Sequence, residues 1–542
     1  MSTEIKKEKK WTIIMQISAE NNLFDDMLNV MQELYNIKTA DNSIDEFDDV
    51  NFIVIFDGLR AEKFSTDFAR PSIYEVKPNS SFLLDFPNPE INGHRIKEDL
   101  SNTNTLTAVY EYIRHYYPAK QFGFICKGHG GPGVGDIGSG QFYEKIFKVP
   151  ADVAGDEDKI KDLISKKIKG WTFEGAYEIK GYIPCNDDNR YVMVILSRNN
   201  NKALTYRKLS EVLYDVFKRE KRAFLFLDCC WGMQIESAYT FMNNCEYFIA
   251  SADEMPAAGI GYDDFLAKII CRPRIIGREI ANMLLSVYFT NKYDDYDVDI
   301  EEFRHMGVSL TNLKTDALRE FINKFNTLCE YLCREMDQLG ILILKARKCC
   351  RDYTYVVPDE YAVFNIDMIW FFENLRYFND KLCINDEELS GMLLEIIYIL
   401  TVKLRYGYLG NNYDDALLGT EALGGKGITI TFPETRDLFD ISFYSSEESV
   451  RPRFVNDTGW NNVLLSYYEY TKKNAKEPAK FIEYYHNKFN KGNTHLLSIF
   501  NIEDINNEDS PGRISSLFTD YPRVTTESKW GKFVPINGQS GT

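Results

Sequence analysis

Short apolar runs alternate with helix-like segments over the first half of this chain. Each run is long enough for one buried strand, and the segments between the runs carry apolar residues at helical spacing. Strands are expected at residues 11–17, 51–57, 121–126, 222–228 and 245–251, and helices at 22–36, 103–117, 207–219 and 234–243. Strands that alternate with helices form parallel sheets through right-handed crossovers. The sequence therefore predicts an α/β fold, a mainly parallel sheet flanked by helices.

The second half of the chain predicts mostly helix. A long amphipathic stretch runs from Leu310 to Ala346 within a helical region at 276–350, and a buried strand is expected at Gly427–Pro433. Further helices are expected near 365–376 and 387–406. Because 542 residues exceed the size of one typical core, we expect several regions. These are an α/β domain at 1–270 with an insertion at 140–205, a helical region with a late strand completing the core at 271–470, and a C-terminal extension at 471–542.

Composition narrows the classes of partner and the compartment. A net charge of −18 disfavours nucleic acid as the main binding partner, since phosphate binding requires clustered Lys and Arg. No apolar stretch is long enough to span a membrane, and the N-terminus carries no apolar signal region, so no membrane partner is expected. Eleven cysteines without a CxxC pair indicate neither a disulfide framework nor a zinc site. A cytoplasmic location is expected.

His129 follows one of the predicted strands, in the glycine-rich segment Gly128–Gly135. Glycines let the backbone turn sharply and point N–H groups at developing negative charge, so this loop suits a catalytic base. The alternative is a strand-to-loop turn with an incidental histidine. The segment also matches GxGxxG, but it opens no helix and follows an internal strand, which argues against dinucleotide binding.

Cys230 follows another predicted strand, beside Cys229 and Asp228. Residues two apart on a strand share a face, so Asp228 and Cys230 point one way and Cys229 the other. Ligands of open α/β sheets bind at the carboxyl ends of strands, which makes Cys230 the expected nucleophile beside His129. Asp228 would recognise a cation in a pocket next to the reaction centre. The alternative is a pair of buried core cysteines.

The order His-Gly, then Asp-x-Cys, resembles the clostripain family (C11) of cysteine peptidases, within the caspase-like clan CD. The resemblance covers about residues 11–470 and includes Ala19–Leu23, Asp228–Tyr239, Ile249–Pro256 and Gly427–Pro433. It implies a caspase-haemoglobinase-like fold and an endopeptidase that acts on protein or peptide substrates with Arg or Lys at P1, the residue whose carbonyl is attacked.

The resemblance also assigns roles to residues. His129 and Cys230 would form the catalytic dyad, and the N–H groups of Gly130 and Cys230 would bind the oxyanion. Asp228 would be an acid in the pocket for the basic side chain. Asp253 and Glu254 end the next strand, where a pocket would be lined, although a plain strand-to-helix connection explains these two acids equally well.

Members of the family often cleave themselves, and some depend on Ca²⁺. Self-cleavage is expected within residues 150–206, after one of Lys159, Lys161, Lys166, Lys167 or Lys169. The carboxylate-rich segment Asp294–Glu302 has oxygen ligands for Ca²⁺, but it lacks the mid-loop glycine of an EF-hand, which favours a solvated loop over a Ca²⁺ site. The sequence itself requires no cofactor and leaves the metal unknown.

Two other functions fit the same motifs. The chain can be a latent effector protease that a regulatory protein partner or an upstream cleavage activates in a cell-death or defence pathway. It can also be an inactive caspase-like binding module, against which the presence of both His129 and Cys230 argues.

Overall fold

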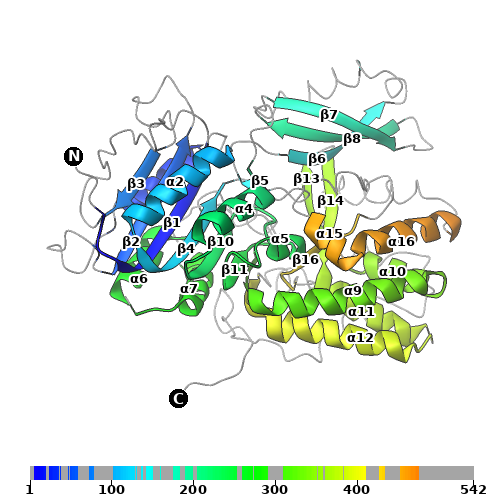
Figure 1. Ribbon diagram of the computed structural model, residues 1–542. Coiled ribbons are helices and arrows are strands. Elements are labelled where there is room, and N and C mark those ends of the chain that lie inside the picture. Colours follow the sequence, from blue (N-terminus) through cyan, green and yellow to red (C-terminus); the bar gives the residue numbers. More distant parts are fainter. Residues whose placement is uncertain are drawn as a thin grey trace.

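The computed structural model in Figure 1 places an α/β body beside a helical part and a second sheet. It describes residues 5–19, 24–35, 37, 47, 49–58, 72–77, 100, 102–128, 130, 136–137, 142–150, 159, 175–183, 189–198, 204–252, 255, 259–272, 274–290, 309–350, 352–357, 360–382, 384–410, 426–433 and 452–474.

The main sheet has eight strands in the order β15-β12-β11-β10-β4-β1-β2-β3. From that first edge strand to the last, the bounds are Arg405–Gly410, Ser309–Lys314, Tyr247–Ala250, Arg222–Asp228, Ala119–Lys127, Lys9–Ala19, Val50–Gly58 and Ser72–Val76. The central strands β2, β1, β4, β10 and β11 are parallel, and β3, β12 and β15 join antiparallel at the edges. The predicted α/β fold with a mainly parallel sheet is confirmed.

Helices cover both faces of this sheet because each strand is apolar on both sides. Phe124 and Leu225 belong to one core cluster, and their neighbours Ile125 and Phe226 to the other. The first face is covered by α2 (Thr103–Tyr116), α4 (Tyr206–Phe217) and α5 (Ile235–Thr240). The second is covered by α1 (Phe24–Tyr35), α6 (Tyr262–Cys271) and α7 (Gly277–Thr290).

The later part of the chain is largely helical, as expected, with one correction. Residues 309–314 form strand β12 of the main sheet, so the predicted amphipathic helix from Leu310 to Ala346 is replaced by a strand followed by two helices. The helical elements here are η1 (Thr315–Ala317), α9 (Leu318–Arg334), α10 (Met336–Lys348), α11 (Met368–Lys381), α12 (Glu387–Tyr398), the π-helical η2 (Ile399–Leu404), α15 (Pro452–Thr458) and α16 (Trp460–Asn474).

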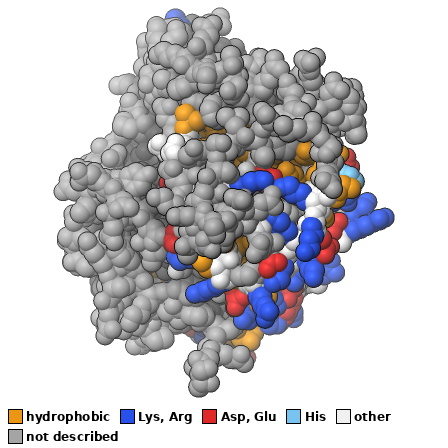
Figure 2. Space-filling model, turned by 90° about the vertical axis from the view of Figure 1, so that its left-hand side faces the viewer, with side chains coloured by type: hydrophobic (Ala, Val, Ile, Leu, Met, Phe, Trp, Pro, Cys, Tyr) orange, Lys and Arg blue, Asp and Glu red, His pale blue; other side chains and the backbone are white. Residues whose placement is uncertain are grey.

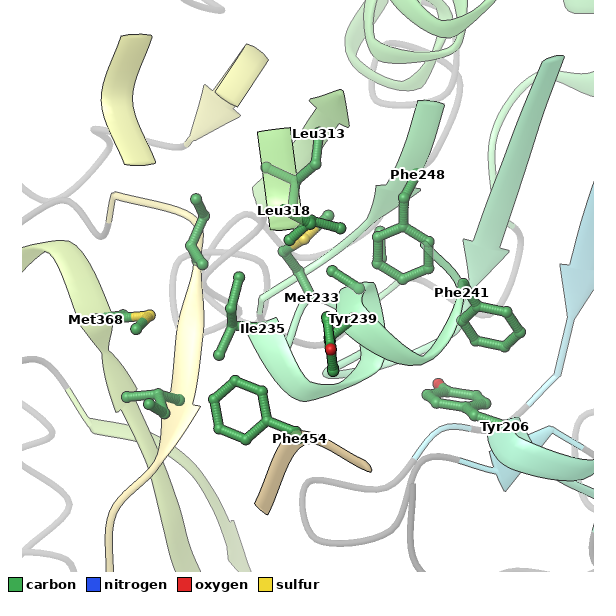
Figure 3. Packing of buried hydrophobic residues seen from close by; sticks show 14 of the residues in the cluster. Tyr206, Met233, Ile235, Tyr239, Phe241, Phe248, Leu313, Leu318, Met368 and Phe454 are labelled. Carbon is green, nitrogen blue, oxygen red and sulfur yellow. The ribbon is translucent and has the colours of Figure 1, made fainter. Parts of the chain in front are cut away.

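These helices share one hydrophobic core with the first face of the main sheet. Figure 3 shows Phe248, Phe241 and Tyr206 of the α/β body near α5, and Met368 and Phe454 on its other side. The short helix α5 thus packs between the sheet and the helical part. The helical part, almost all of it from the predicted region 271–470, therefore continues the body formed by the strands and helices of region 1–270. Strands β12 and β15 of the main sheet also come from region 271–470. The division into domains stays a prediction.

A second sheet of six strands lies beside the helical part in Figure 1. Its main path runs β13-β14-β6-β8-β7, and β16 pairs with β14. The bounds of β6, β7, β8, β13, β14 and β16 are Phe142–Pro150, Gly175–Ile183, Asn189–Arg198, Asp352–Val357, Glu360–Asp367 and Thr429–Thr431. A two-stranded sheet joins β5 (Asp136–Ile137) to β9 (Leu204–Thr205). The insertion at 140–205 therefore pairs with strands from much later in the chain.

Figure 2 shows Lys and Arg side chains gathered next to acidic ones on the described part of the face at the left of Figure 1. No helix in the described part of the chain is long and apolar enough to cross a membrane.

Candidate active site

The carboxyl ends of β4 and β10 lie side by side at one edge of the main sheet. The two strands are parallel, and their register places Lys127 opposite Asp228. One residue further, the Gly128 N–H donates to the Asp228 carbonyl oxygen at 3.3 Å. The segments that carry His129 and Cys230 therefore leave the sheet next to each other. His129 itself lies outside the described residues.

Gly130 packs directly against the backbone that carries the candidate nucleophile. A Cβ atom at this position would lie 2.2 Å from the Cys230 carbonyl oxygen and 3.0 Å from the Cys229 sulfur. Only glycine allows such a close approach of two backbones. The residues on both sides of His129 thus contact the turn after β10, through the Gly128 hydrogen bond and this contact of Gly130.

We expect Gly130→Ala to lower kcat/KM for peptide cleavage by about 10²-fold or more, because the added methyl must push the histidine loop away from Cys230. Steady-state kinetics on a peptide substrate measure this effect. Gly391→Ala is the matched control, since a Cβ there has no neighbour within 4 Å. Equal activity of Gly130→Ala and wild type would show that the tight contact does not position the catalytic loop.

Cys230 sits in the turn after β10 and is partly buried. Its sulfur accepts a hydrogen bond from the Met255 backbone N–H at 3.2 Å, and such a donor stabilises negative charge on sulfur. The next residue, Trp231, has a φ of 52°. A bulky residue rarely adopts this left-handed conformation, so the surrounding packing must hold the turn in place.

Ser251, which follows the neighbouring strand β11, and the distant strand β16 hold the segment after this turn. The Met233 N–H donates to the Ser251 carbonyl oxygen at 2.8 Å, and the Thr429 N–H donates to the Met233 carbonyl oxygen at 3.0 Å. In β16, the Thr431 N–H donates at 2.9 Å to the side chain of Glu236, which is fully buried. The predicted late strand at Gly427–Pro433 therefore supports the segment after Cys230.

Cys229 points to the opposite face of the sheet, as the alternation of side chains predicts. It is 1% exposed, and its sulfur lies 3.2 Å from the Tyr206 hydroxyl oxygen. Burial raises the pKa of this thiol well above its usual value. Cys229 thus stays protonated near neutral pH and is a poor nucleophile.

We therefore expect iodoacetamide to alkylate Cys230 well before Cys229 in the native protein near neutral pH. Peptide mapping by mass spectrometry at short reaction times gives the order of labelling. Cys126, which is buried and whose pKa burial raises to about 12, is the internal control for an unreactive thiol. Faster labelling of Cys229 than of Cys230 would contradict the assigned orientations.

Asp228 is held in a buried ion pair that sequence reasoning missed. Its Oδ2 lies 2.9 Å from the Lys127 ammonium, and the two side chains are 0% and 2% exposed. The Tyr262 hydroxyl donates to the same carboxylate oxygen. Burial, followed by the Asp228 charge, raises the pKa of Tyr262 well above its usual value. The charged Lys127 directly after the apolar run 122–126 was the available signal.

Several predicted residues lie outside the described part of the chain. They are His129, Asp253, Glu254, Lys161, Lys166, Lys167, Lys169 and the segment Asp294–Glu302. Lys159 is described and exposed. Among the described residues, no group of three or more His, Cys, Asp or Glu side chains is placed to hold a metal ion. The structure thus brings together Gly130, Asp228 and Cys230 of the predicted site.

The mixed eight-stranded sheet with helices on both faces is an α/β fold. The family model described as "Clostripain family" (Peptidase C11) matches residues 184–509. The chain therefore belongs to the clostripain family of cysteine peptidases. No curated protein matches it.

Similar solved structures include further C11 proteases. An inactive zymogen C11 protease from Parabacteroides distasonis is 13% identical, with 85% of this chain and 99% of that chain covered at a TM-score of 0.48. A secreted C11 cysteine protease from Bacteroides thetaiotaomicron, in complex with an irreversible peptide inhibitor, is also 13% identical, with 83% and 99% covered at a TM-score of 0.48.

Proposed function

We propose that this protein is a cysteine endopeptidase with Cys230 as nucleophile and His129 as general base. The observation that carries the proposal is the pairing of the two strand ends, where Gly128 and Gly130 contact the turn that presents Cys230. Family membership supplies the reaction class, peptide hydrolysis.

The proposed reaction has two stages. The Cys230 sulfur forms a bond to the peptide carbonyl carbon, and His129 takes the thiol proton and passes it to the leaving amine as the C–N bond breaks. Water then attacks the thioester, which releases the carboxylic acid and regenerates the thiol. The N–H groups of Gly130 and Cys230 are proposed to bind the oxyanion in both stages, where one donor is typically worth about 10²–10³ in rate.

We also propose cleavage after Arg or Lys, as the family resemblance predicts. Asp228, Asp253 and Glu254 are the acids proposed for recognition of the basic side chain. Asp228 already pairs with Lys127, so Asp253 and Glu254 are the better candidates for direct contact with the substrate. An ion pair across the binding pocket would give selectivity between basic and neutral side chains.

Cleavage-site profiling on a peptide library tests the proposed function. Wild type should cleave after Arg or Lys, and Cys230→Ala should cleave nothing above background. Parallel runs with Ca²⁺ and with a chelator test whether this protein depends on Ca²⁺, as some members of the family do. Cleavage that persists in Cys230→Ala would remove Cys230 from the mechanism, and cleavage after other residues would overturn the proposed specificity.

Self-cleavage within residues 150–206 is proposed as part of maturation, after Lys159, Lys161, Lys166, Lys167 or Lys169. Lys159 is exposed, which a processing site requires. On a denaturing gel, wild type should run as fragments and Cys230→Ala as one chain. If the C-terminal fragment starts outside this segment, or if Cys230→Ala is cut identically when purified alone, autoprocessing within the insertion is wrong.

The mode of regulation stays a further proposal. A latent protease activated by a protein partner would show low basal cleavage that rises with the partner or after limited proteolysis. An inactive binding module would not react at Cys230 with an active-site thiol probe. The cytoplasmic location, and the exclusion of nucleic acid and membranes as partners, stay predictions from composition.

A further inference from the structure

Asp228 and Lys127 form a closed unit next to the candidate nucleophile. Asp228 precedes Cys230 by two residues, which is about 7 Å of extended backbone. A long side chain on the P1 residue of a substrate bound at Cys230 is within reach of this carboxylate. The carboxylate oxygen Oδ2, however, already interacts with the Lys127 ammonium and the Tyr262 hydroxyl.

The backbone of Gly259 closes this unit from outside. A Cβ atom at Gly259 would lie 2.5 Å from Asp228 Oδ2 and 2.5 Å from the Lys127 nitrogen, and the residue has a φ of 70°. Lys127 also lies over the Tyr262 ring, with its nitrogen 6.0 Å from the ring centroid. The segment that leads into α6 therefore covers the pair on the Oδ2 side, whereas Asp228 Oδ1 is buried and has no hydrogen-bond partner among the described residues.

Charge balance decides what Asp228 can offer to a substrate cation. A substrate ammonium or guanidinium that reached Oδ1 would lie beside a carboxylate whose charge Lys127 already balances. A neutral ion pair attracts a third charge only weakly, and the Lys127 ammonium repels a second cation at the same carboxylate. If the substrate displaced Lys127 instead, Lys127 would be a buried charge without a counter-ion, which is strongly unfavourable. Asp228 thus gives little net gain for a basic P1 residue.

We propose that Lys127 is a specificity-determining residue, an internal counter-ion that withholds Asp228 from substrate. This inference rests on the proposed peptidase function and refines its substrate class. Preference for a basic P1 residue in this protein does not arise from Asp228. Removal of the Lys127 ammonium leaves the Asp228 carboxylate without a counter-ion, and its unpartnered Oδ1 then selects a Lys or Arg side chain at P1.

The test compares two matched peptides that carry Lys or norleucine at P1, and it uses the ratio of their kcat/KM values. Lys127→Met/Asp228→Asn removes both charges together and should keep the wild-type ratio within about twofold. Lys127→Met alone should raise the ratio by about tenfold or more, because the freed carboxylate pairs with the substrate ammonium. Lys127→Arg keeps the pair and should keep the wild-type ratio.

Two outcomes would overturn the inference. In the first, the double variant Lys127→Met/Asp228→Asn, the neutral pair, loses a preference for Lys at P1 that wild type shows. In the second, Lys127→Met folds but prefers Lys no more than the neutral pair does. If Lys127→Met fails to fold, the neutral pair alone decides, because it leaves no charge without a partner.

Benzamidine binding gives a readout that needs no catalysis. All variants here also carry Cys230→Ala, and Cys230→Ala alone is the parent. Benzamidine should raise the melting temperature of the variant with Lys127→Met. It should leave the melting temperatures of the parent and of the neutral pair unchanged. Stabilisation of the parent that the neutral pair loses would overturn the inference. If wild type cleaves no peptide, the proposed function fails, while the benzamidine measurements still decide whether Lys127 withholds Asp228.

Discussion

Cys230→Ala should lower kcat/KM for peptide cleavage by about three orders of magnitude or more, because no thioester can form without the sulfur. The fold should be retained, since Cys230 is only partly buried and the change removes a single atom. Steady-state hydrolysis of a peptide with Lys at P1, together with the melting temperature, measures both effects.

Cys229→Ala is the matched control for this experiment. The two cysteines are adjacent, but the Cys229 sulfur lies on the other face of the sheet, next to Tyr206. This variant should therefore keep cleavage within about tenfold of wild type and lose only packing. If instead Cys229→Ala abolished cleavage and Cys230→Ala did not, the roles of the two thiols would be reversed.

Lys127→Met should destabilise the protein by about 3–5 kcal/mol, because it leaves the Asp228 carboxylate buried without its counter-ion. Adding Asp228→Asn should recover most of that loss, since the second change removes the unpaired charge. Denaturant unfolding of wild type, both single variants and the double variant gives the coupling free energy directly.

The surface pair of Lys10 and Asp49 supplies the control for this cycle. Their side chains are 33% and 35% exposed, with the ammonium and carboxylate 3.3 Å apart. Lys10→Met should cost less than about 1 kcal/mol, as for other exposed pairs. A loss at Lys127 as small as that at Lys10, with no recovery from Asp228→Asn, would contradict the buried pair described above.

The central strands were predictable because their apolar runs are local signals. The expected strand at 222–228 matches β10, and those at 121–126 and 51–57 match β4 and β2 to within a few residues. Edge strands were not predictable in this way. Leu310 and Leu313 of β12 are three residues apart, which reads as helical spacing and merges with the helix that follows.

The second sheet depends on pairings between distant segments. Tyr361 of β14 pairs with Ile146 of β6, and Thr431 of β16 pairs with Asn365 of β14. Within the insertion, β7 and β8 follow each other along the chain and pair as antiparallel neighbours. Nothing local in the insertion indicates its partner strand, because strand pairing across such separations is set by the tertiary fold.

At the site, sheet topology was the most informative principle. It placed the ends of β4 and β10 together, as the Gly128 hydrogen bond to Asp228 shows. The environment of Asp228 was not predictable from its spacing to Cys230, because spacing fixes only the face of the strand. The cation on that face comes from the neighbouring strand, and its identity as Lys127 becomes clear only from the β4–β10 register.

Covalent labelling by a peptidyl chloromethyl ketone with Lys at P1 tests the central claim most directly. The account predicts that mass spectrometry finds one adduct on Cys230 of the native protein, that its formation parallels loss of activity, and that His129→Ala slows it strongly. An adduct on Cys229 or any other cysteine, or full activity after Cys230 is completely labelled, would contradict it.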